Sequence, residues 1–453
     1  MASAHSVSEV MMSPLELRRL FERAEKPESE WRVGVECERF GVHRKSGAPL
    51  GYDGAFGVLR IFDWLIERRG YLPERELPDG PVVAVKKGGL SLTLEPGAQF
   101  ELSAAAVSDL HQVTDALCAY DHELLPISEE LDVAWLSLGF HPFAAQRDLP
   151  WVPKQRYAIM REYLPKRGSG ALDMMRRTAT VQGNFDYSNE LDALKKLMVA
   201  LRLSPIINAW VANSPYVEGR ARGKLSVRGD VWLRMEPERS GLLGQLWQRS
   251  ELGYADYIEW ALDAPMFLIK RAGKIIDNSG QTFRDFMASG FQGQTASFQD
   301  WQLHINSLFP EARLKSTLEL RSVDCLHPKL ATSVIALFTG ILYDATALAD
   351  ARAVLGKVSF EQASAARPQL VSHGLSAAYG PYPGFALAAD LLSVARAGLE
   401  RRARLEQGKD ETGYLEPLEQ LLSERASPAS KLLDRFGEVP DRERLIAGLA
   451  ASG

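Results

Sequence analysis

The segment from Ser91 to Leu102 alternates between polar and apolar side chains with almost no exception. Its even positions carry Leu, Leu, Pro, Ala, Phe and Leu, and its odd positions carry Ser, Thr, Glu, Gly, Gln and Glu. Because successive side chains of a strand point to opposite faces, the pattern predicts a strand with one face on a core. The other face then gathers Glu95, Gln99 and Glu101. We interpret this polar face as part of a site.

Three other segments repeat the alternation: 32–40 with Glu36 and Glu38 on one face, 180–186 with Gln182 and Asn184, and 317–322 with Glu319 and Arg321. For any one strand, an antiparallel strand with water on one side is the commoner explanation. Four strands that carry Glu, Gln and Asn but almost no Lys are less well explained this way, because exposed faces usually mix Lys with Glu.

Convergence of these faces would bring five carboxylates into a small volume: Glu36, Glu38, Glu95, Glu101 and Glu319. Like charges at short range raise one another's pKa unless cations neutralise them, so bound metal is the economical solution. Carboxylate and amide oxygens suit hard cations, Mg²⁺ in particular. The chain has no His-x-x-x-His or Cys-x-x-Cys pair, so zinc has no obvious ligand set.

Composition narrows the class of protein. The 453 residues, 46% of them apolar, can bury a sizeable core in one large domain or two or three smaller ones. A net charge of -5 argues against a dedicated nucleic-acid binder. Three scattered cysteines and a start without a basic region and apolar core predict a cytoplasmic protein. The longest apolar stretch, 330–343, is too short to span a bilayer and predicts a buried helix.

Strand patterns separated by helices of unequal length predict an α+β fold, an antiparallel sheet covered by helices. The principal helices are expected at 13–25, 55–69, 107–130, 155–164 and 189–213, and the chain is almost wholly helical from about 328. We expect a catalytic sheet domain over 1–345 and a helical C-terminal region over 346–453, packed as one unit. The Gly-, Gln- and Ser-rich stretch 289–297 predicts a surface loop, with a lid as the alternative.

Familiar nucleotide signatures are absent: there is no P-loop and no Gly-x-Gly-x-x-Gly after a strand. What remains is an acidic sheet face with basic residues in nearby segments: Arg156, Arg161, Arg177, Arg228, Arg313, Lys315 and Arg321. Mg²⁺ between carboxylates and phosphates, with Arg beside the transferring group, is the setting for ATP-dependent phosphoryl transfer. Each Arg alone is more often an ion-pair residue, and Arg228 and Arg321 are the two that we favour for function.

A family resemblance gives these patterns a chemical interpretation. It rests on Gly34-Val-Glu-Cys-Glu-Arg-Phe-Gly41, Leu94-Glu-Pro-Gly-Ala-Gln-Phe-Glu-Leu-Ser103, Tyr157-Ala-Ile-Met-Arg161, Leu172-Asp-Met-Met-Arg-Arg-Thr178, Ala212-Asn-Ser-Pro215 and Phe309-Pro-Glu-Ala-Arg-Leu-Lys315 with Glu319-Leu-Arg321. Together these motifs closely resemble the plant-type glutamate-cysteine ligases, a group also found in bacteria. The likeness covers nearly the whole chain and is less specific for the amine substrate.

The resemblance implies a glutamine synthetase-like α+β fold, with a curved antiparallel sheet forming a funnel and helices outside. It also implies ligation of L-glutamate to L-cysteine at the expense of ATP, the first step of glutathione biosynthesis. The γ-carboxylate of glutamate would form an acyl phosphate, which the cysteine amine then attacks. The implied cofactors are two or three Mg²⁺ ions with ATP as co-substrate. Glutamate, cysteine and ATP are the expected partners of a monomer or homodimer, with no nucleic acid or membrane.

The same resemblance assigns roles to individual residues. The implied metal ligands are Glu36, Glu38, Glu95, Glu101, Gln182 and Glu319. The implied substrate or ATP contacts are Gln99, Arg156, Arg161, Arg177, Asn184, Arg228, Arg313 and Lys315. Arg321, Glu319 and Arg228 are the implied catalytic residues, with Arg321 steadying the transferring phosphoryl group.

The chain departs from the plant pattern at Thr114 and Asn278, where plant members are expected to carry cysteines of redox-active pairs. A disulfide switch at these positions is therefore not expected. The alternatives are a related carboxylate-amine ligase that uses glutamate with another amine, a guanidino kinase, and a degenerate fold kept for binding. A degenerate fold kept for binding is expected to lack metal-binding acids, yet every expected acid is present in this sequence.

Overall fold

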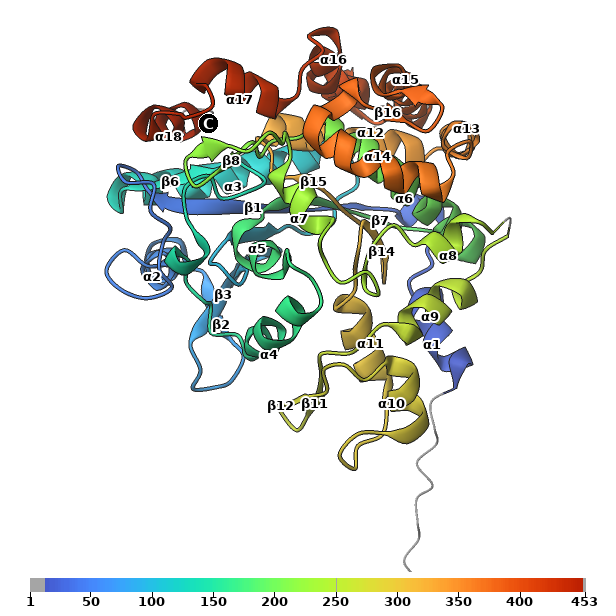
Figure 1. Cartoon of the computed structure of the whole chain (residues 1–453), viewed down its shortest axis with the longest axis horizontal. Helices are drawn as coiled ribbons and strands as arrows, with labels where there is room; N and C mark the ends of the chain where they lie inside the picture. Colours follow the sequence, from blue (N-terminus) through green and yellow to red (C-terminus); the bar gives the residue numbers. More distant parts are fainter. Residues whose placement is uncertain (1–12, 250, 451–453) are drawn as a thin grey trace, which may run out of the picture.

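The computed structural model describes residues 13–249 and 251–450. The expectation that the chain starts without a secretory leader concerns residues before Ser13, which lie outside the described residues. Figure 1 shows one large sheet with helices stacked on one face and a smaller group of elements on the other. In the described part this sheet has nine strands in the order β14-β15-β7-β1-β5-β4-β3-β2, with β6 also paired to β1. Each of these pairings is antiparallel.

The strands of the large sheet are β1 (Val33–His43), β2 (Leu72–Arg75), β3 (Val82–Lys87), β4 (Leu90–Leu94), β5 (Phe100–Ser103), β6 (Val133–Leu136), β7 (Thr180–Phe185), β14 (Ala312–Leu314) and β15 (Leu318–Asp324). The remaining strands form short two-stranded pairs: β8 (Tyr216–Val217) with β9 (Arg220–Ala221), β10 (Ser240–Gly241) with β13 (Phe309–Pro310), β11 (Leu268–Arg271) with β12 (Lys274–Asp277), β16 (Ala378–Tyr379) with β17 (Tyr382–Pro383), and β18 (Leu405–Glu406) with β19 (Lys409–Asp410).

Helices divide between the two faces of the sheet (Figure 1). One face carries α3 (Leu110–Glu130), α6 (Glu190–Trp210), α12 (Pro328–Leu342), α13 (Ala345–Leu355), α14 (Phe360–His373), α15 (Gly384–Arg402), α16 (Glu416–Ser423), α17 (Pro428–Phe436) and α18 (Arg442–Ala450). The others are α1 (Pro14–Glu22), α2 (Val58–Arg69), α4 (Gln155–Tyr163), α5 (Ala171–Arg177), α7 (Val227–Trp232), α8 (Gly244–Trp247), α9 (Tyr254–Asp263), α10 (Phe283–Ser289) and α11 (Phe298–Asn306).

The long elements follow the sequence patterns closely. The alternating segment 32–40 falls almost wholly within β1, the helix expected at 107–130 is α3, and the helix expected at 189–213 is α6. Apolar residues of β1 such as Val35 and Cys37 are buried in the main core, whereas Glu36 and Glu38 line a cavity, as alternation requires. The predicted α+β sheet covered by helices is confirmed.

The prediction of one strand over 92–102 is wrong. The segment is a hairpin: β4 ends at Leu94, β5 begins at Phe100, and the turn between them carries the Ala98 amide hydrogen-bonded to the Glu95 carbonyl at 2.9 Å. Ala98 is left-handed, with φ of 66°. The Pro96-Gly97 dipeptide is a turn signal that outweighs the alternation. Glu95 and Glu101 nevertheless face one cavity, because β4 and β5 pair with each other.

One hydrophobic core extends through both expected regions. Phe338 and Leu342 of α12, within 1–345, belong to the same buried cluster as Leu391 and Leu399 of α15. Within the described residues, no single helix combines the length and apolarity needed to cross a membrane, and α12 with α13 does so only as a pair bent by 97°.

Gly97 is the tightest point of the β4–β5 turn. A Cβ placed there would lie 2.4 Å from the Arg176 carbonyl oxygen and 2.7 Å from its Cα, both backbone atoms that cannot rotate away. We expect Gly97→Ala to lower the free energy of unfolding by about 1–3 kcal/mol, because the turn or α5 has to shift. Urea unfolding followed by circular dichroism measures this. Gly413→Ala is the matched control, since a Cβ there meets nothing within 4 Å, and equal losses in the two variants would contradict the prediction.

Candidate active site

A cavity of about 460 Å³ opens on the face of the sheet opposite the long helices. Its floor consists of polar side chains from β1, β5, β7 and β15 and from the β4–β5 turn. Its walls come from α4, α5, α7 and the segment 266–309 and are largely apolar: Tyr157, Met160, Met174, Met175, Trp232, Met266, Phe267, Leu268, Leu303 and Phe309. A polar floor with apolar walls is the usual form of a small-molecule site.

Four carboxylates meet on the floor: Glu36, Glu38, Glu95 and Glu101. Glu38 on β1 lies directly opposite Glu101 on β5, and Glu36 lies opposite Gln182 on β7. Like charges in directly opposed positions destabilise a sheet, so this pairing costs the fold stability. An arrangement that works against folding is typical of a functional site.

Burial and mutual repulsion shift the pKa values of these acids. Burial, with Glu95 and Glu101 nearby, raises the pKa of Glu38 well above its ordinary value. Burial, with Glu95 and Glu36 nearby, raises the pKa of Glu101 to about 8. Hydrogen bonds only partly compensate: the Thr180 amide donates to Glu38 at 3.0 Å and the Thr93 hydroxyl donates to Glu101 at 3.0 Å. A cation would favour the charged forms of both acids.

The donor set fits a hard divalent cation, because it consists of carboxylate oxygens with the amide of Gln182 beside them. In residues 13–249 and 251–450, however, no three Asp, Glu, His or Cys side chains stand close enough to hold one ion as they are placed. The acids therefore share a cavity without forming a finished metal centre. Side-chain rotation of Glu36, Glu38, Glu95 or Glu101 would have to bring the oxygens together.

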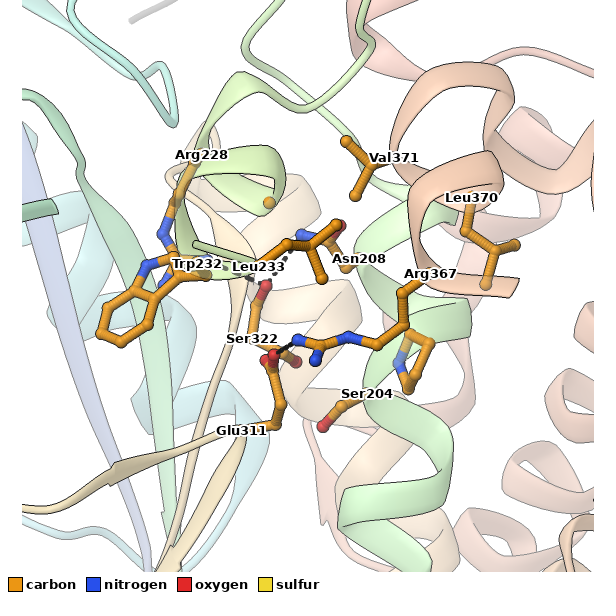
Figure 2. A pocket seen from close by; sticks show the side chains of 12 residues that line it. Ser204, Asn208, Arg228, Trp232, Leu233, Glu311, Ser322, Arg367, Leu370 and Val371 are labelled. Carbon is orange, nitrogen blue, oxygen red and sulfur yellow. Dashed lines mark hydrogen bonds and ion pairs between the residues drawn. The ribbon is translucent and has the colours of Figure 1, made fainter. Parts of the chain in front are cut away.

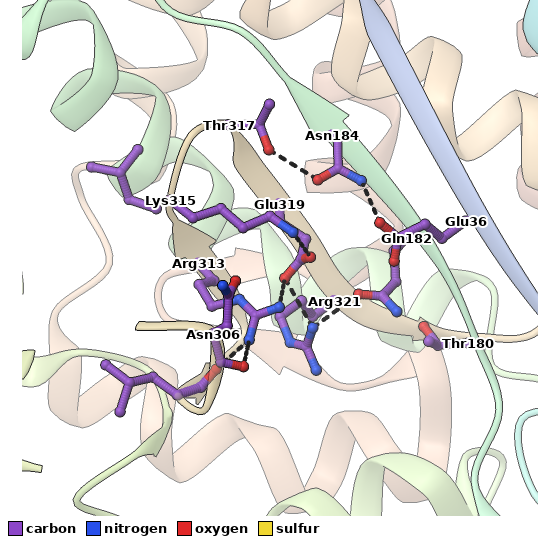
Figure 3. A network of polar contacts seen from close by, with 12 residues as sticks. Glu36, Thr180, Gln182, Asn184, Asn306, Arg313, Lys315, Thr317, Glu319 and Arg321 are labelled. Carbon is purple, nitrogen blue, oxygen red and sulfur yellow. Dashed lines mark hydrogen bonds and ion pairs between the residues drawn. The ribbon is translucent and has the colours of Figure 1, made fainter. Parts of the chain in front are cut away.

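Glu319 has different surroundings from the other acids (Figure 3). The residue is 1% exposed, and its carboxylate contacts three cations: Lys315 Nζ at 2.5 Å, Arg313 Nη2 at 2.6 Å and Arg321 Nη1 at 2.9 Å. Burial alone would raise the pKa of Glu319, but these cations outweigh it and hold that pKa well below its ordinary value. Three positive charges around one negative charge leave a positive region on the cavity wall, which suits a phosphate or carboxylate.

Arg228 is buried under the same wall. Its Nη1 donates to the Ser322 carbonyl at 2.9 Å and its Nη2 to the Arg321 carbonyl at 2.6 Å, beside Trp232 (Figure 2). These carbonyls lie where the pairing of β15 with β7 shifts between Leu320 and Val323. Arg228 therefore satisfies backbone groups at a bulge and also lines the cavity.

Asp324 anchors Arg228 from behind. The Asp324 carboxylate accepts hydrogen bonds from the hydroxyls of Ser214 at 2.6 Å and Ser226 at 2.8 Å. Ser226 also caps α7 by accepting from the Gly229 amide at 2.9 Å. The start of α7, and with it Arg228, is thereby tied to the end of β15.

Two predicted contact residues are engaged elsewhere. Gln99 lines the cavity, but its Oε1 accepts from the Gly97 amide at 2.8 Å and its Nε2 donates to the Thr178 carbonyl at 2.8 Å. Its amide thus holds the β4–β5 turn against the chain before β7. Asn184 does not line the cavity and hydrogen-bonds to Glu36 instead.

Of the remaining predicted arginines, Arg156 lies at the cavity and Arg161 and Arg177 do not. Arg156 lines the cavity, with Nη2 3.2 Å from the Tyr157 hydroxyl. Arg161 is exposed on α4, its guanidinium 4.8 Å from the Trp151 ring centre. Arg177 is buried outside the cavity, 3.3 Å from Asp173. Arg161 and Arg177 are thus not brought to the floor.

Comparison with known proteins decides the family. The glutamate-cysteine ligase family 2 (GCS2) model matches residues 32–448. The chain belongs to this family. It is 35% identical over 418 residues to the chloroplastic glutamate–cysteine ligase of Nicotiana tabacum, covering 91% of this chain and 77% of that protein. Glutamate–cysteine ligase B of Oryza sativa subsp. japonica is also 35% identical, over 91% of this chain and 81% of its own.

A solved structure supports the ligase fold. Glutamate–cysteine ligase of Francisella tularensis, in complex with AMP, matches with a TM-score of 0.54 and 12% identity, covering 93% of this chain and 87% of that one. At this identity the likeness shows the fold alone. The glutamine synthetase-like fold expected from the family resemblance is confirmed, as a large antiparallel sheet that is not closed into a barrel.

Sequence reasoning missed several residues of the cavity. Thr180 shares its face with Gln182, so the alternation of β7 could have indicated it. Thr317 lies just before β15, outside the cavity lining, and contacts Asn184; it shares its parity with Glu319 and Arg321, so the alternation of 317–322 could have indicated it as well. The apolar wall of Phe267, Leu303 and other residues from 266–309 gave no local signal, because it is assembled only in three dimensions.

His304 of α11 is a buried neutral histidine. Its Nε2 donates to the Ala261 carbonyl at 2.7 Å, and burial lowers its pKa to about 3. Because the pKa of His304 is lower in the folded protein than its ordinary value of 6.5, the folded state favours the neutral imidazole. The stability that this contributes is fully present above pH 6.5 and is lost as the pH falls towards 3.

The variant His304→Gln keeps a donor for Ala261 but does not titrate. We expect it to be less stable than the parent at pH 7, where it loses the stacking on Phe283. The difference should shrink by roughly 2–3 kcal/mol at pH 4.5, where only the parent pays for keeping a histidine neutral. Urea unfolding at the two pH values measures both quantities, and a deficit that stays constant with pH would contradict the assigned protonation state.

Proposed function

We propose that this protein is a cytosolic, ATP- and Mg²⁺-dependent ligase that joins the γ-carboxylate of L-glutamate to the amine of L-cysteine. This reaction is the first step of glutathione biosynthesis. The observation that carries the proposal is the meeting, in one cavity of a GCS2-family chain, of four carboxylates with the cation group Arg313, Lys315 and Arg321. The named relatives are glutamate–cysteine ligases, and one structural neighbour holds AMP.

In the proposed reaction, the glutamate γ-carboxylate attacks the γ-phosphorus of ATP and ADP leaves. The cysteine amine then attacks the acyl phosphate, forming the amide and releasing phosphate and a proton. The cation group accounts for the first step, because Arg321 and Lys315 can pair with the oxygens of the transferring phosphoryl group. Arg228 and Arg156, on other walls of the cavity, are the proposed anchors for a substrate carboxylate or phosphate.

Glu36, Glu38, Glu95 and Glu101, with Gln182, are the proposed holders of Mg²⁺, with Glu319 joining them when its cations turn to the substrate. Mg²⁺ would neutralise the triphosphate and the acids together. The negative charge of the cavity floor comes from these carboxylates. The apolar walls exclude water, which protects a reactive acyl phosphate from hydrolysis.

The choice of amine is tested by product analysis. Purified protein with ATP, Mg²⁺ and glutamate is given cysteine or one of several other amines, and phosphate release and product mass are followed. We expect phosphate release to require glutamate and an amine together, with cysteine preferred and γ-glutamylcysteine as product. Equal release with other amines would favour a related carboxylate-amine ligase, and release without glutamate would contradict the proposal altogether.

Glu95→Gln tests the cation site with little structural risk, because in the described contacts the Glu95 side chain has no hydrogen bond or ion pair, unlike Glu319. Loss of one ligand charge should lower kcat/KM by at least about 100-fold at saturating Mg²⁺ and leave the melting temperature near that of the parent. Glu67→Gln on the exposed face of α2 is the matched control. Near-parental activity of Glu95→Gln would refute the assignment.

Glu319→Gln is expected to lose activity and also stability. The change leaves Arg313, Lys315 and Arg321 without their shared counter-ion in a buried position. Breaking a buried ion-pair network by removing one partner typically costs about 3–5 kcal/mol. Activity assays combined with urea unfolding would show this, and a variant as stable as the parent would argue against the network.

A further inference from the structure

Asn184 lies on the cavity face of β7 between two other strands. It pairs in register with Gly34 of β1 on one side and with Glu319 of β15 on the other. A Cβ at position 34 would lie 3.1 Å from the Asn184 Cβ, so a glycine at this position leaves room for the asparagine side chain. The amide can therefore reach along the sheet to Glu36, its diagonal neighbour.

The orientation of the Asn184 amide follows from its partners (Figure 3). Glu36 as a carboxylate can only accept, so the Asn184 Nδ2 donates to Glu36 Oε1, at 3.0 Å. The Asn184 Oδ1 is then free to accept, and the Thr317 hydroxyl donates to it at 3.0 Å. A chain of two hydrogen bonds thus runs from Thr317 through Asn184 to Glu36.

We propose that Thr317 and Asn184 are positioning residues that orient the Glu36 carboxylate for cation binding, an inference that rests on the proposed function. Asn184 is not a substrate contact, because its oxygen and its amide nitrogen are both engaged and it does not line the cavity. One Glu36 oxygen is held by Asn184 and the other is left for a ligand.

Glu36 needs such an anchor because of its neighbours. Its carboxylate shares the floor with Glu319 and the other acids, and repulsion would turn an unanchored side chain away. Lys315 and Arg321 attract the Glu36 carboxylate, but both form ion pairs with Glu319, at 2.5 Å and 2.9 Å. They therefore do not fix the position of Glu36. Outer hydrogen-bond partners of metal ligands typically change metal affinity by about 10–100-fold when they are removed.

The test uses the full-length protein stripped of metal and titrated with Mn²⁺, with free Mn²⁺ measured by electron paramagnetic resonance, both without substrates and with ATP. The variants are Thr317→Val, Thr317→Ser and Asn184→Ala. Thr346→Val, on the exposed first turn of α13, is the matched control. Circular dichroism melting confirms that each variant is folded.

We expect Thr317→Val and Asn184→Ala to weaken Mn²⁺ binding by about 10-fold or more, while Thr317→Ser and Thr346→Val stay within about twofold of the parent. The Mg²⁺ concentration for half-maximal velocity should rise in the same order. Parental Mn²⁺ affinity in Thr317→Val, or equal loss in Thr317→Ser and Thr317→Val, would overturn the inference.

The two proposals fail in distinguishable ways. If the parent protein makes no γ-glutamylcysteine but the Mn²⁺ affinities follow the expected order, the proposed function fails and the role of Thr317 and Asn184 stands. If the parent is active and the variants bind Mn²⁺ as it does, only the positioning role fails. If the parent takes up no Mn²⁺ in either condition, the positioning role is overturned as well.

Discussion

The pairing of β1 with β5 and β7 is the constraint on which the rest of the site depends. It sets Glu38 opposite Glu101 and Glu36 opposite Gln182, so acidic side chains of distant segments face one another. The same strand buries Val35 and Cys37 against the helices, and a slip of one residue would exchange the two faces. Burial of the apolar face therefore fixes the charged face, at the cost of placing carboxylates in repulsive contact.

The cavity separates its charges into two groups with different physical states. Burial and the neighbouring acids raise the pKa values of Glu38 and Glu101, whereas three contacting cations hold the pKa of Glu319 well below its ordinary value. The first group suits a cation, and the second suits an anion held by Arg313, Lys315 and Arg321. A substrate that carries phosphates and binds Mg²⁺ satisfies both groups at once, which is the physical basis for proposing ATP-dependent ligation.

Several residues, through contacts within the protein, determine where the charged groups lie. Arg228 satisfies the carbonyls of the β15 bulge, and Asp324 ties α7 to the end of that strand. Gln99 locks the turn beside Glu95, and Asn184 holds Glu36. Some polar residues near the cavity can contact a ligand, and others hold the ligand-contacting side chains in place. The residue type alone does not tell these two roles apart.

The sequence by itself determined the antiparallel sheet, the long helices and the polar faces of β1, β5, β7 and β15, because period-two and helical patterns are local. It misread 92–102, where alternation continues through the Pro96-Gly97 turn. Only the tertiary structure decided that Arg161 and Arg177 lie off the floor, that Asn184 supports Glu36, and that residues 266–309 close the wall. Those outcomes depend on contacts between segments far apart in the chain, and no local pattern encodes them.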